Sequence, residues 1–233
     1  MNGNSARLVL WDIDLTLVDL RGLGGRWYAD ALATVAGVAL RDLPSFPGRT
    51  ERAISMELLA THGIEPTEDR IRAVWQELVR LSSAARPALT GYGHALPGAA
   101  AVLSALAGQD GVVQSLVTGN LPEIAEHKLS AFDLHTHIDF GIGGYGSLSA
   151  HRPDLVAHAV ALAARKHDHA FAPESVIVIG DTPHDVEAAR AHGAVAVGVA
   201  TGRHSEHELQ ASGANVVFGD LSDTGAVLGA LPT

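Results

Sequence analysis

Two carboxylates directly follow an apolar stretch near the start of the chain. Residues 8–11 suit a buried parallel strand and end in Asp12 and Asp14, with Thr16 two residues further on. Carboxylates at the end of a central strand are costly unless something compensates them, and hard oxygen ligands suit Mg²⁺. Because open α/β sheets bind ligands at the carboxyl ends of their strands, we expect a Mg²⁺-dependent site here.

Two later apolar segments, residues 112–117 and 175–179, also end in polar clusters. These clusters are Thr118, Gly119 and Asn120 after the first segment, and Asp181, Thr182 and Asp185 after the second. In a parallel sheet all three strand ends lie on one edge, so the clusters can converge. Their joint occurrence is much more specific than any one of them.

The remaining elements must bring these clusters together. From residue 87 onward, predicted strands alternate with predicted helices, which is typical of a parallel sheet covered on both faces. The expected strands are 8–11, 112–117, 136–140, 175–179, 195–199 and 215–218. Helices are expected at 25–37, 51–62 and 68–85, with no strand in the block 20–86. We therefore predict an α/β, Rossmann-like core formed by residues 1–19 and 87–233, with an all-helical insertion at 20–86.

Composition narrows the classes of function. The chain has 233 residues and a net charge of −10, which argues against a nucleic-acid partner because phosphate backbones need basic surfaces. It has no cysteine, no signal-peptide pattern and no apolar run long enough to span a membrane. We expect a cytoplasmic protein without a membrane partner, either a monomer or a homodimer.

The three clusters resemble motifs of the haloacid dehalogenase (HAD) superfamily, and the resemblance covers essentially the whole chain. Asp12-x-Asp14-x-Thr16 is similar to the first motif, Thr118 to the second, and Gly180-Asp181-x-x-x-Asp185 to the fourth. The helical insertion resembles the C1-type cap of this superfamily. Within it, residues 46–50 are similar to the cap loop that meets the substrate in phosphoglycolate-phosphatase-like members.

The resemblance implies a Mg²⁺-dependent phosphatase that acts on a small phosphorylated metabolite through an aspartyl-phosphate. Asp12 would be the nucleophile, and Asp14 would protonate the leaving group and then activate water. The Mg²⁺ ligands would be Asp12, the backbone carbonyl of Asp14 and Asp181, with Asp185 helping directly or through water. The expected phosphate and substrate contacts are Thr118, Gly119, Asn120 and Thr16.

The third motif departs from the family pattern. Members normally carry a lysine before the helix that precedes the fourth motif, whereas this chain has Arg152 followed by a proline. Arginine can bind phosphate through two hydrogen bonds, but it cannot lose its proton. The rival is Lys128, one of only two lysines in the chain, on the predicted helix after Thr118. We favour Arg152 as the third-motif cation and retain Lys128 as the alternative.

Several further readings stay open. Arg49 in the cap loop is either a substrate ligand or a surface residue at a helix start, whereas Trp27 and Tyr28 are expected in the core between cap helices. The same motifs would also suit a phosphomutase of the β-phosphoglucomutase type. From a different class, the chain could be a non-catalytic protein that binds a phosphate ligand, and only the missing third-motif lysine favours that hypothesis.

Overall fold

The core is a six-stranded parallel sheet, so the predicted α/β class is confirmed. The computed structural model describes residues 6–20 and 22–231; the ends of the predicted core, 1–5 and 232–233, and residue 21 of the predicted insertion lie outside the described residues. The strand order is β5 (Gly144–Tyr145), β4 (Val112–Thr118), β1 (Arg7–Trp11), β6 (Val176–Gly180), β7 (Val195–Val199) and β8 (Val216–Phe218). Strand β1 lies between β4 and β6, so all three strands with polar ends are neighbours.

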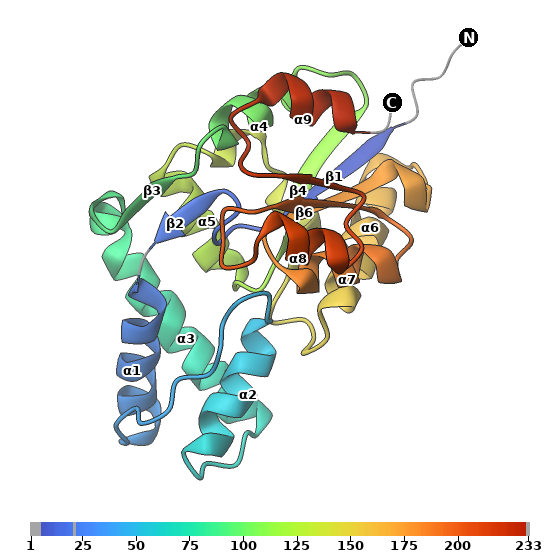
Figure 1. The fold of residues 1–233 in the computed structure, drawn as a ribbon. Helices are drawn as coiled ribbons and strands as arrows, with labels where there is room; N and C mark the ends of the chain where they lie inside the picture. Colours follow the sequence, from blue (N-terminus) through green and yellow to red (C-terminus); the bar gives the residue numbers. More distant parts are fainter. Residues whose placement is uncertain (1–5, 21, 232–233) are drawn as a thin grey trace.

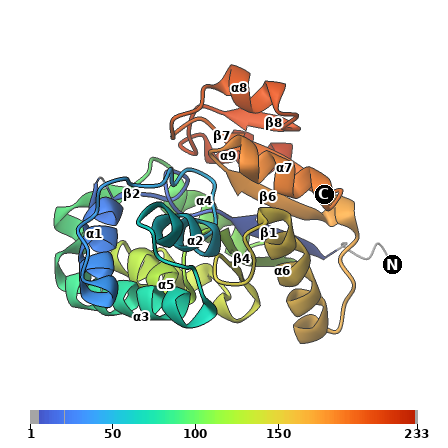
Figure 2. The same ribbon diagram turned by 90° about the horizontal axis from the view of Figure 1, so that it is seen from below.

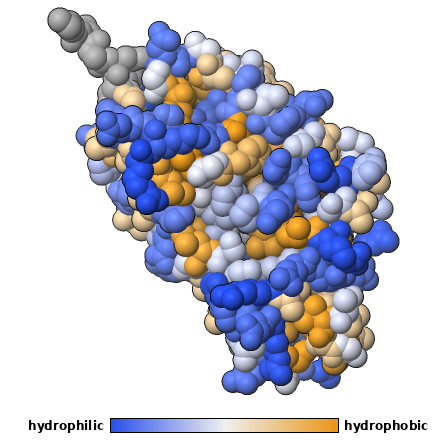
Figure 3. Space-filling model, turned by 180° about the vertical axis from the view of Figure 1, so that it is seen from behind, coloured by the Kyte–Doolittle hydropathy of each residue, from blue (hydrophilic) through white to orange (hydrophobic). Residues whose placement is uncertain are grey.

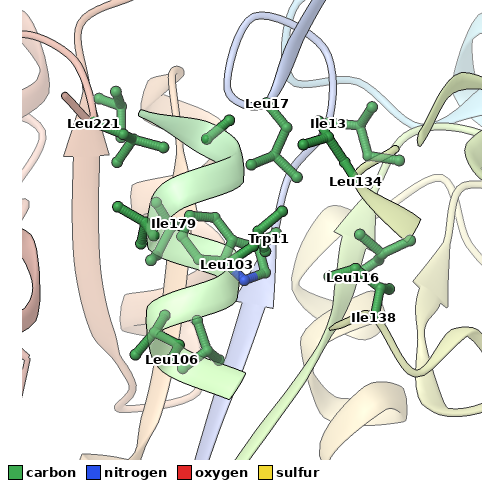
Figure 4. Packing of buried hydrophobic residues seen from close by; sticks show 14 of the residues in the cluster. Trp11, Ile13, Leu17, Leu103, Leu106, Leu116, Leu134, Ile138, Ile179 and Leu221 are labelled. Atoms are coloured by element: carbon green, nitrogen blue, oxygen red, sulfur yellow. The ribbon is translucent and has the colours of Figure 1, made fainter. Parts of the chain in front are cut away.

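Helices cover both faces of this sheet because β1 is apolar on both sides. Val9 and Trp11 point to one face and Leu8 and Leu10 to the other, and all four side chains are fully buried. The first face packs against α4 (Ala99–Ala107), α5 (Pro122–Ala131) and α9 (Thr224–Ala230); the second packs against α6 (Arg152–His167), α7 (Pro183–Ala191) and α8 (Glu206–Ala211) (Figure 1). In the close view, the Trp11 indole lies against Leu103 of α4 (Figure 4).

A separate apolar cluster, in addition to those on the two faces of the sheet, holds the inserted helices together. Helices α1 (Leu23–Ala36), α2 (Glu51–Thr61) and α3 (Glu68–Ala85) pack to one side of the sheet, as both ribbon views show (Figures 1 and 2). Thr50 and Thr67 cap α2 and α3 by accepting hydrogen bonds from Ala53 and Arg70. We call these three helices and the loop between α1 and α2 the cap.

A short antiparallel ribbon joins the cap to the core, which the sequence did not predict. Strand β2 (Val18–Leu20) pairs with β3 (Gly93–Ala95), and the chain passes from β3 to α4 in the core. Each strand has only three residues, so neither carries a period-2 pattern long enough to recognise. A 3₁₀ helix at Arg86–Gly91 lies between α3 and β3.

The strand predicted at 136–140 is wrong. This segment instead forms two 3₁₀ turns, at His135–His137 and Phe140–Ile142, and the strand that pairs with β4 is Gly144–Tyr145. Asp139 explains the difference, because its side chain accepts a hydrogen bond from the Gly141 amide and caps the second turn. Residues 138 and 140 are apolar because they pack against the core beside β4, and not because this segment pairs with β4 as a strand.

The outer surface carries apolar residues in separate patches. On the face shown in Figure 3, these patches are interrupted by hydrophilic residues over both the core and the cap. Among the described residues, no helix has the length and apolar character needed to cross a membrane.

Candidate active site

The polar ends of β1 and β6 meet at one edge of the sheet, as the parallel arrangement requires. Asp12 follows β1, Asp181 follows β6, and Asp185 lies in the first turn of α7. One carboxylate oxygen from each of these residues lies within 4.8 Å of the other two. All three side chains are buried, and Thr182 fixes Asp185 by donating its hydroxyl to the carboxylate at 2.6 Å.

The guanidinium of Arg152, at the start of α6, lies among these carboxylates. Its Nη2 atom is 2.9 Å from an Asp12 oxygen, 2.6 Å from an Asp185 oxygen and 3.1 Å from the Val117 carbonyl. Its Nη1 atom donates to the Gly48 carbonyl in the cap loop at 3.2 Å. Arg152 therefore contacts the ends of β1 and β4, α7 and the cap loop at once. The Nε atom is buried and has no acceptor among the described residues.

The charges in this cluster do not balance. Three buried carboxylates surround one guanidinium, and burial raises the pKa of Asp12 to about 7 even though Arg152 lowers it. Burial raises the pKa of Asp181 to about 9, and the neighbouring charges of Asp12 and Asp185 add to that rise. The site therefore has to bind protons or a further cation. Three carboxylates around one point are hard oxygen donors, so the residues present fit Mg²⁺.

The second carboxylate of the first motif lies in a different network. The Lys128 Nζ atom is 2.7 Å from both oxygens of Asp14, and the Asn120 amide donates to Asp14 at 2.8 Å. The same Asn120 amide donates to the Thr118 hydroxyl oxygen at 2.8 Å. The side chain of Asp14 is 46 % exposed, in contrast to the buried Asp12. Arg152 and Lys128 thus both reach the site, each against a different carboxylate.

The other predicted contact residues divide into two groups. Gly119 and Asn120 line the cavity above the carboxylates, as does Arg49 from the cap loop. The Arg49 guanidinium, however, pairs with Glu57 at 2.6 Å. Thr16 is fully buried outside the cavity lining, and its hydroxyl lies 3.5 Å from an Asp181 oxygen, which suits positioning of Asp181 better than contact with a substrate.

A cavity of about 910 Å³ lies between the carboxylates and the cap. Two backbone hydrogen bonds hold the cap onto the core beside it: the amides of Glu51 and Arg52, at the start of α2, donate to the carbonyls of Gly119 and Gly146 at 2.9 Å each. A Cβ atom on Gly146 would collide with the Gly119 carbonyl oxygen and lie 2.6 Å from the Glu51 amide nitrogen. The chain therefore needs glycine at position 146 for the cap to come this close.

Glu51 and Tyr28 also line this cavity, and sequence reasoning did not assign them to the site. Both are buried, and the Tyr28 hydroxyl lies 2.7 Å from each oxygen of Glu51. Trp27 and Tyr28 belong to the apolar cluster of the cap, as expected, but both also line the cavity. Little in the sequence indicated a role for Glu51, because acidic residues are common in the first turn of a helix.

The family assignment agrees with this geometry. The profile of the haloacid dehalogenase-like hydrolases matches residues 9–190, which include all the clusters described above. The chain belongs to this family. The predicted recognition is thereby confirmed, and the chain is an enzyme of the HAD hydrolase family with the parallel core that its sequence predicted.

Similar proteins carry phosphatase and mutase names. A probable phosphatase from Dickeya dadantii, IndB, is 29% identical over 232 residues, covering 93% of this chain and 90% of that protein. Two solved structures share the fold. One, described as a predicted phosphoglycolate phosphatase from Haemophilus somnus, has a TM-score of 0.67, 19% identity and coverage of 96% and 98%. Another, proposed to be a β-phosphoglucomutase from Bacteroides vulgatus, has a TM-score of 0.66, 21% identity and coverage of 98% and 91%.

Proposed function

We propose that the protein hydrolyses the phosphomonoester of a small metabolite, with Mg²⁺ bound, through a phosphorylated Asp12. The observation that carries this proposal is the buried Asp12 carboxylate at the floor of a capped cavity, beside Asp181, Asp185 and the Arg152 guanidinium. An in-line nucleophile next to a cation and a metal-binding carboxylate set is what phosphoryl transfer needs. The cavity volume suits a small ester rather than a protein substrate.

The residues of the chain divide the chemistry between them. The Asp12 carboxylate attacks phosphorus, and the ester oxygen leaves with a proton from Asp14. Asp14, held between Lys128 and Asn120, then takes a proton from water, and the resulting hydroxide releases phosphate and restores Asp12. Arg152 holds phosphate oxygens through its guanidinium, whose Nε hydrogen has no acceptor in the described protein.

The metal would be held by Asp12 and Asp181, with Asp185 directly or through water and the Asp14 backbone carbonyl as a further ligand. When bound, Mg²⁺ supplies positive charge at the phosphate oxygens and at the nucleophile. The carboxylates that would hold it are the ones whose charge the protein leaves unbalanced.

The test is phosphate release from p-nitrophenyl phosphate and a panel of small phosphate esters, with Mg²⁺ and with EDTA. We expect Mg²⁺-dependent turnover that Asp12→Asn abolishes, because the amide is not a nucleophile. Asp69→Asn is the matched control, since Asp69 is exposed on α3 and its substitution should leave turnover unchanged. Intact-protein mass spectrometry of wild type during turnover should detect one added phosphoryl group.

Two alternatives give different results in the same assay. A mutase of the β-phosphoglucomutase type would release little phosphate and would retain its phosphoryl group in water until a second substrate arrives. A non-catalytic phosphate-binding protein would release none and would show no added phosphoryl group. Equal phosphate release by wild type and Asp12→Asn would contradict the proposed mechanism.

A further inference from the structure

Glu51 is a buried carboxylate at the cap end of the cavity, and the proposed reaction does not use it. It is the first residue of α2 and is only 6% exposed. Its backbone amide donates to the Gly119 carbonyl at 2.9 Å, next to the Thr118 cluster. Glu51 is among the residues that line the cavity, as is Asp12 at its core end. Glu51 therefore faces the space that the leaving group of a phosphate ester would occupy.

The partners of Glu51 are hydroxyl groups rather than cations. Tyr28 donates to the carboxylate at 2.7 Å and Ser55 donates at 3.0 Å, and Trp75 in turn donates to Ser55 at 3.0 Å. No described residue forms an ion pair with Glu51. A carboxylate has about four acceptor positions, and these two hydroxyls do not fill them. The group thus retains the capacity to accept further hydrogen bonds, and it is negatively charged above its pKa, which burial raises to about 7.

The walls around Glu51 are apolar. Among the described residues of the three cap helices that line the cavity, Glu51 is the only charged one; the others include Leu23, Trp27, Ile54 and Leu78. The ring of Phe46 stacks on Tyr28 with centroids 5.1 Å apart. A carboxylate in such surroundings is costly unless a donor meets it, so this end of the cavity favours a ligand that is apolar except for one donor.

The nearby cations do not reverse this preference. Arg49 in the cap loop is paired with Glu57 at 2.6 Å and donates to the Ser45 carbonyl. Lys128 lies against Asp14, and Arg203, which also lines the cavity, is exposed on the loop after β7. A leaving group that carried a carboxylate or a second phosphate toward α2 would therefore approach the buried carboxylate of Glu51, whereas these three cations are paired or exposed.

We propose that Glu51 determines which phosphate esters the enzyme accepts. The favoured ester has a leaving group with an apolar body that ends in a hydroxyl, amide or ammonium donor, which binds Glu51. Leaving groups that end in a carboxylate or a second phosphate are excluded, because like charges in a buried site repel strongly. This inference rests on the proposed phosphatase function and names the substrate class of that same site.

A structural role for Glu51 is the competing explanation. The Tyr28–Glu51–Ser55 hydrogen bonds join α1 to α2, and they could serve only to hold the cap together. A glutamine would preserve the size of the side chain and one acceptor oxygen, so a structural role survives Glu51→Gln far better than a role that depends on charge. The two explanations therefore separate on substrate selectivity rather than on stability.

The experiment measures kcat/KM for three benzyl phosphates that differ only at the para position, with methyl, hydroxymethyl or carboxylate. The reacting bonds are the same in all three esters. At about pH 8, above the Glu51 pKa of about 7, we expect wild type to prefer the hydroxymethyl ester over the carboxylate ester by at least roughly 100-fold. Glu51→Gln should reduce this ratio to less than about tenfold while changing turnover of the methyl ester by less than about threefold.

Glu65→Gln is the matched control, because Glu65 is exposed on the loop between α2 and α3 and its substitution removes the same charge. It should keep the wild-type ratio. If Glu51→Gln does not fold, Glu51→Asp replaces it; the retained charge should still exclude the carboxylate ester, while the shorter side chain should lose the preference for hydroxymethyl over methyl.

Each outcome decides the inference. A wild-type enzyme that hydrolyses all three esters equally, or a Glu51→Gln enzyme that keeps the wild-type ratio, overturns the role of Glu51 while leaving the phosphatase function intact. Absence of Mg²⁺-dependent hydrolysis of every ester overturns the proposed function and this inference with it. Loss of selectivity in Glu51→Gln but not in Glu65→Gln supports it.

Discussion

The core end and the cap end of the cavity differ in the number of their charged groups and in the partners of those groups. At the core end, three carboxylates and Arg152 lie within hydrogen-bonding or metal-binding distance of one another, and Lys128 holds a fourth carboxylate. At the cap end, Glu51 is the only charged residue of the described cap helices that lines the cavity, and hydroxyl groups donate to its carboxylate among apolar walls. In the proposed reaction, the core end stabilises the phosphoryl group that all substrates share, whereas the cap end distinguishes between their leaving groups.

The largest expected effect comes from the core end. Arg152→Ala should lower kcat/KM by at least about three orders of magnitude, because it removes a phosphate ligand and leaves Asp12 and Asp185 without their shared cation. Arg152→Lys keeps the charge but loses the two-pronged geometry, and should lower kcat/KM by about 10- to 100-fold. Steady-state kinetics on the best ester measures both.

Arg152→Lys also tests whether the site is degraded. If Arg152→Lys greatly increased activity, arginine would be a poor substitute for lysine at the third-motif position. The core end of the cavity would then be a degraded phosphatase site. A loss in both variants, with unchanged far-ultraviolet circular dichroism, would establish Arg152 as the working cation.

A smaller effect is expected where the two ends meet. Gly146→Ala would place a methyl group against the Gly119 carbonyl and the Glu51 amide, so the cap could not approach the core as closely. We expect KM to rise by about tenfold and kcat to fall less, since closure assembles the substrate contacts. Gly229→Ala on α9 is the control, because a Cβ atom there meets no described atom within 4 Å apart from its chain neighbours and the backbone of its own helix. Equal kinetics for both variants would contradict a closure role for this contact.

The last expected effect is on stability rather than on catalysis, and it belongs to the cap end. Burial raises the pKa of Glu51 from 4.5 to about 7, although Tyr28, Ser55 and Lys128 lower it. The folded state therefore holds this proton more tightly than the unfolded state, and Glu51 costs stability as pH rises from 4.5 through 7. Glu51→Gln should have the same melting temperature as wild type near pH 4.5 and should gain stability above pH 7, by on the order of 2–3 kcal/mol.

Thermal unfolding of both proteins across this pH range measures the difference directly. Comparing the two proteins cancels the contributions of Asp12 and Asp181, whose raised pKa values are present in each. A difference that is constant with pH would show that Glu51 does not titrate in this range.

The core end was largely predictable from the sequence because its residues follow strands. Parallel strands place their carboxyl ends on the same edge of the sheet. Because Asp12 and Asp181 follow two strands that are neighbours, their side chains lie close together. The contact between Arg152 and Asp12 was harder to predict, because Arg152 lies at the start of α6 and reaches Asp12 only through its long side chain. The sequence predicted Arg152 as a site residue, but it did not predict the hydrogen bond that Arg152 donates to the Gly48 carbonyl.

The site residues at the cap end could not be predicted from the sequence, because their burial and their contacts depend on tertiary packing. Glu51 reads as an ordinary first-turn acid, and only the packing of α1 against it reveals a buried carboxylate that faces a cavity. The strand at Gly144–Tyr145 was missed for a similar reason: it is two residues long and exists because β4 is beside it. Sequence periodicity cannot report a pairing partner that is distant in the chain.

The position of β1 at the centre of the sheet has a consequence for the order in which the protein is made. Its two partners, β4 and β6, begin at Val112 and Val176, so the ribosome completes the cap before either partner exists. The cap helices contact one another within residues 23–85, whereas the pairing of β1 must wait for β4, which begins at Val112, and for β6. Asp12 is thus synthesised before the cap and acquires its neighbours Arg152 and Asp185 only after Asp185 has left the ribosome.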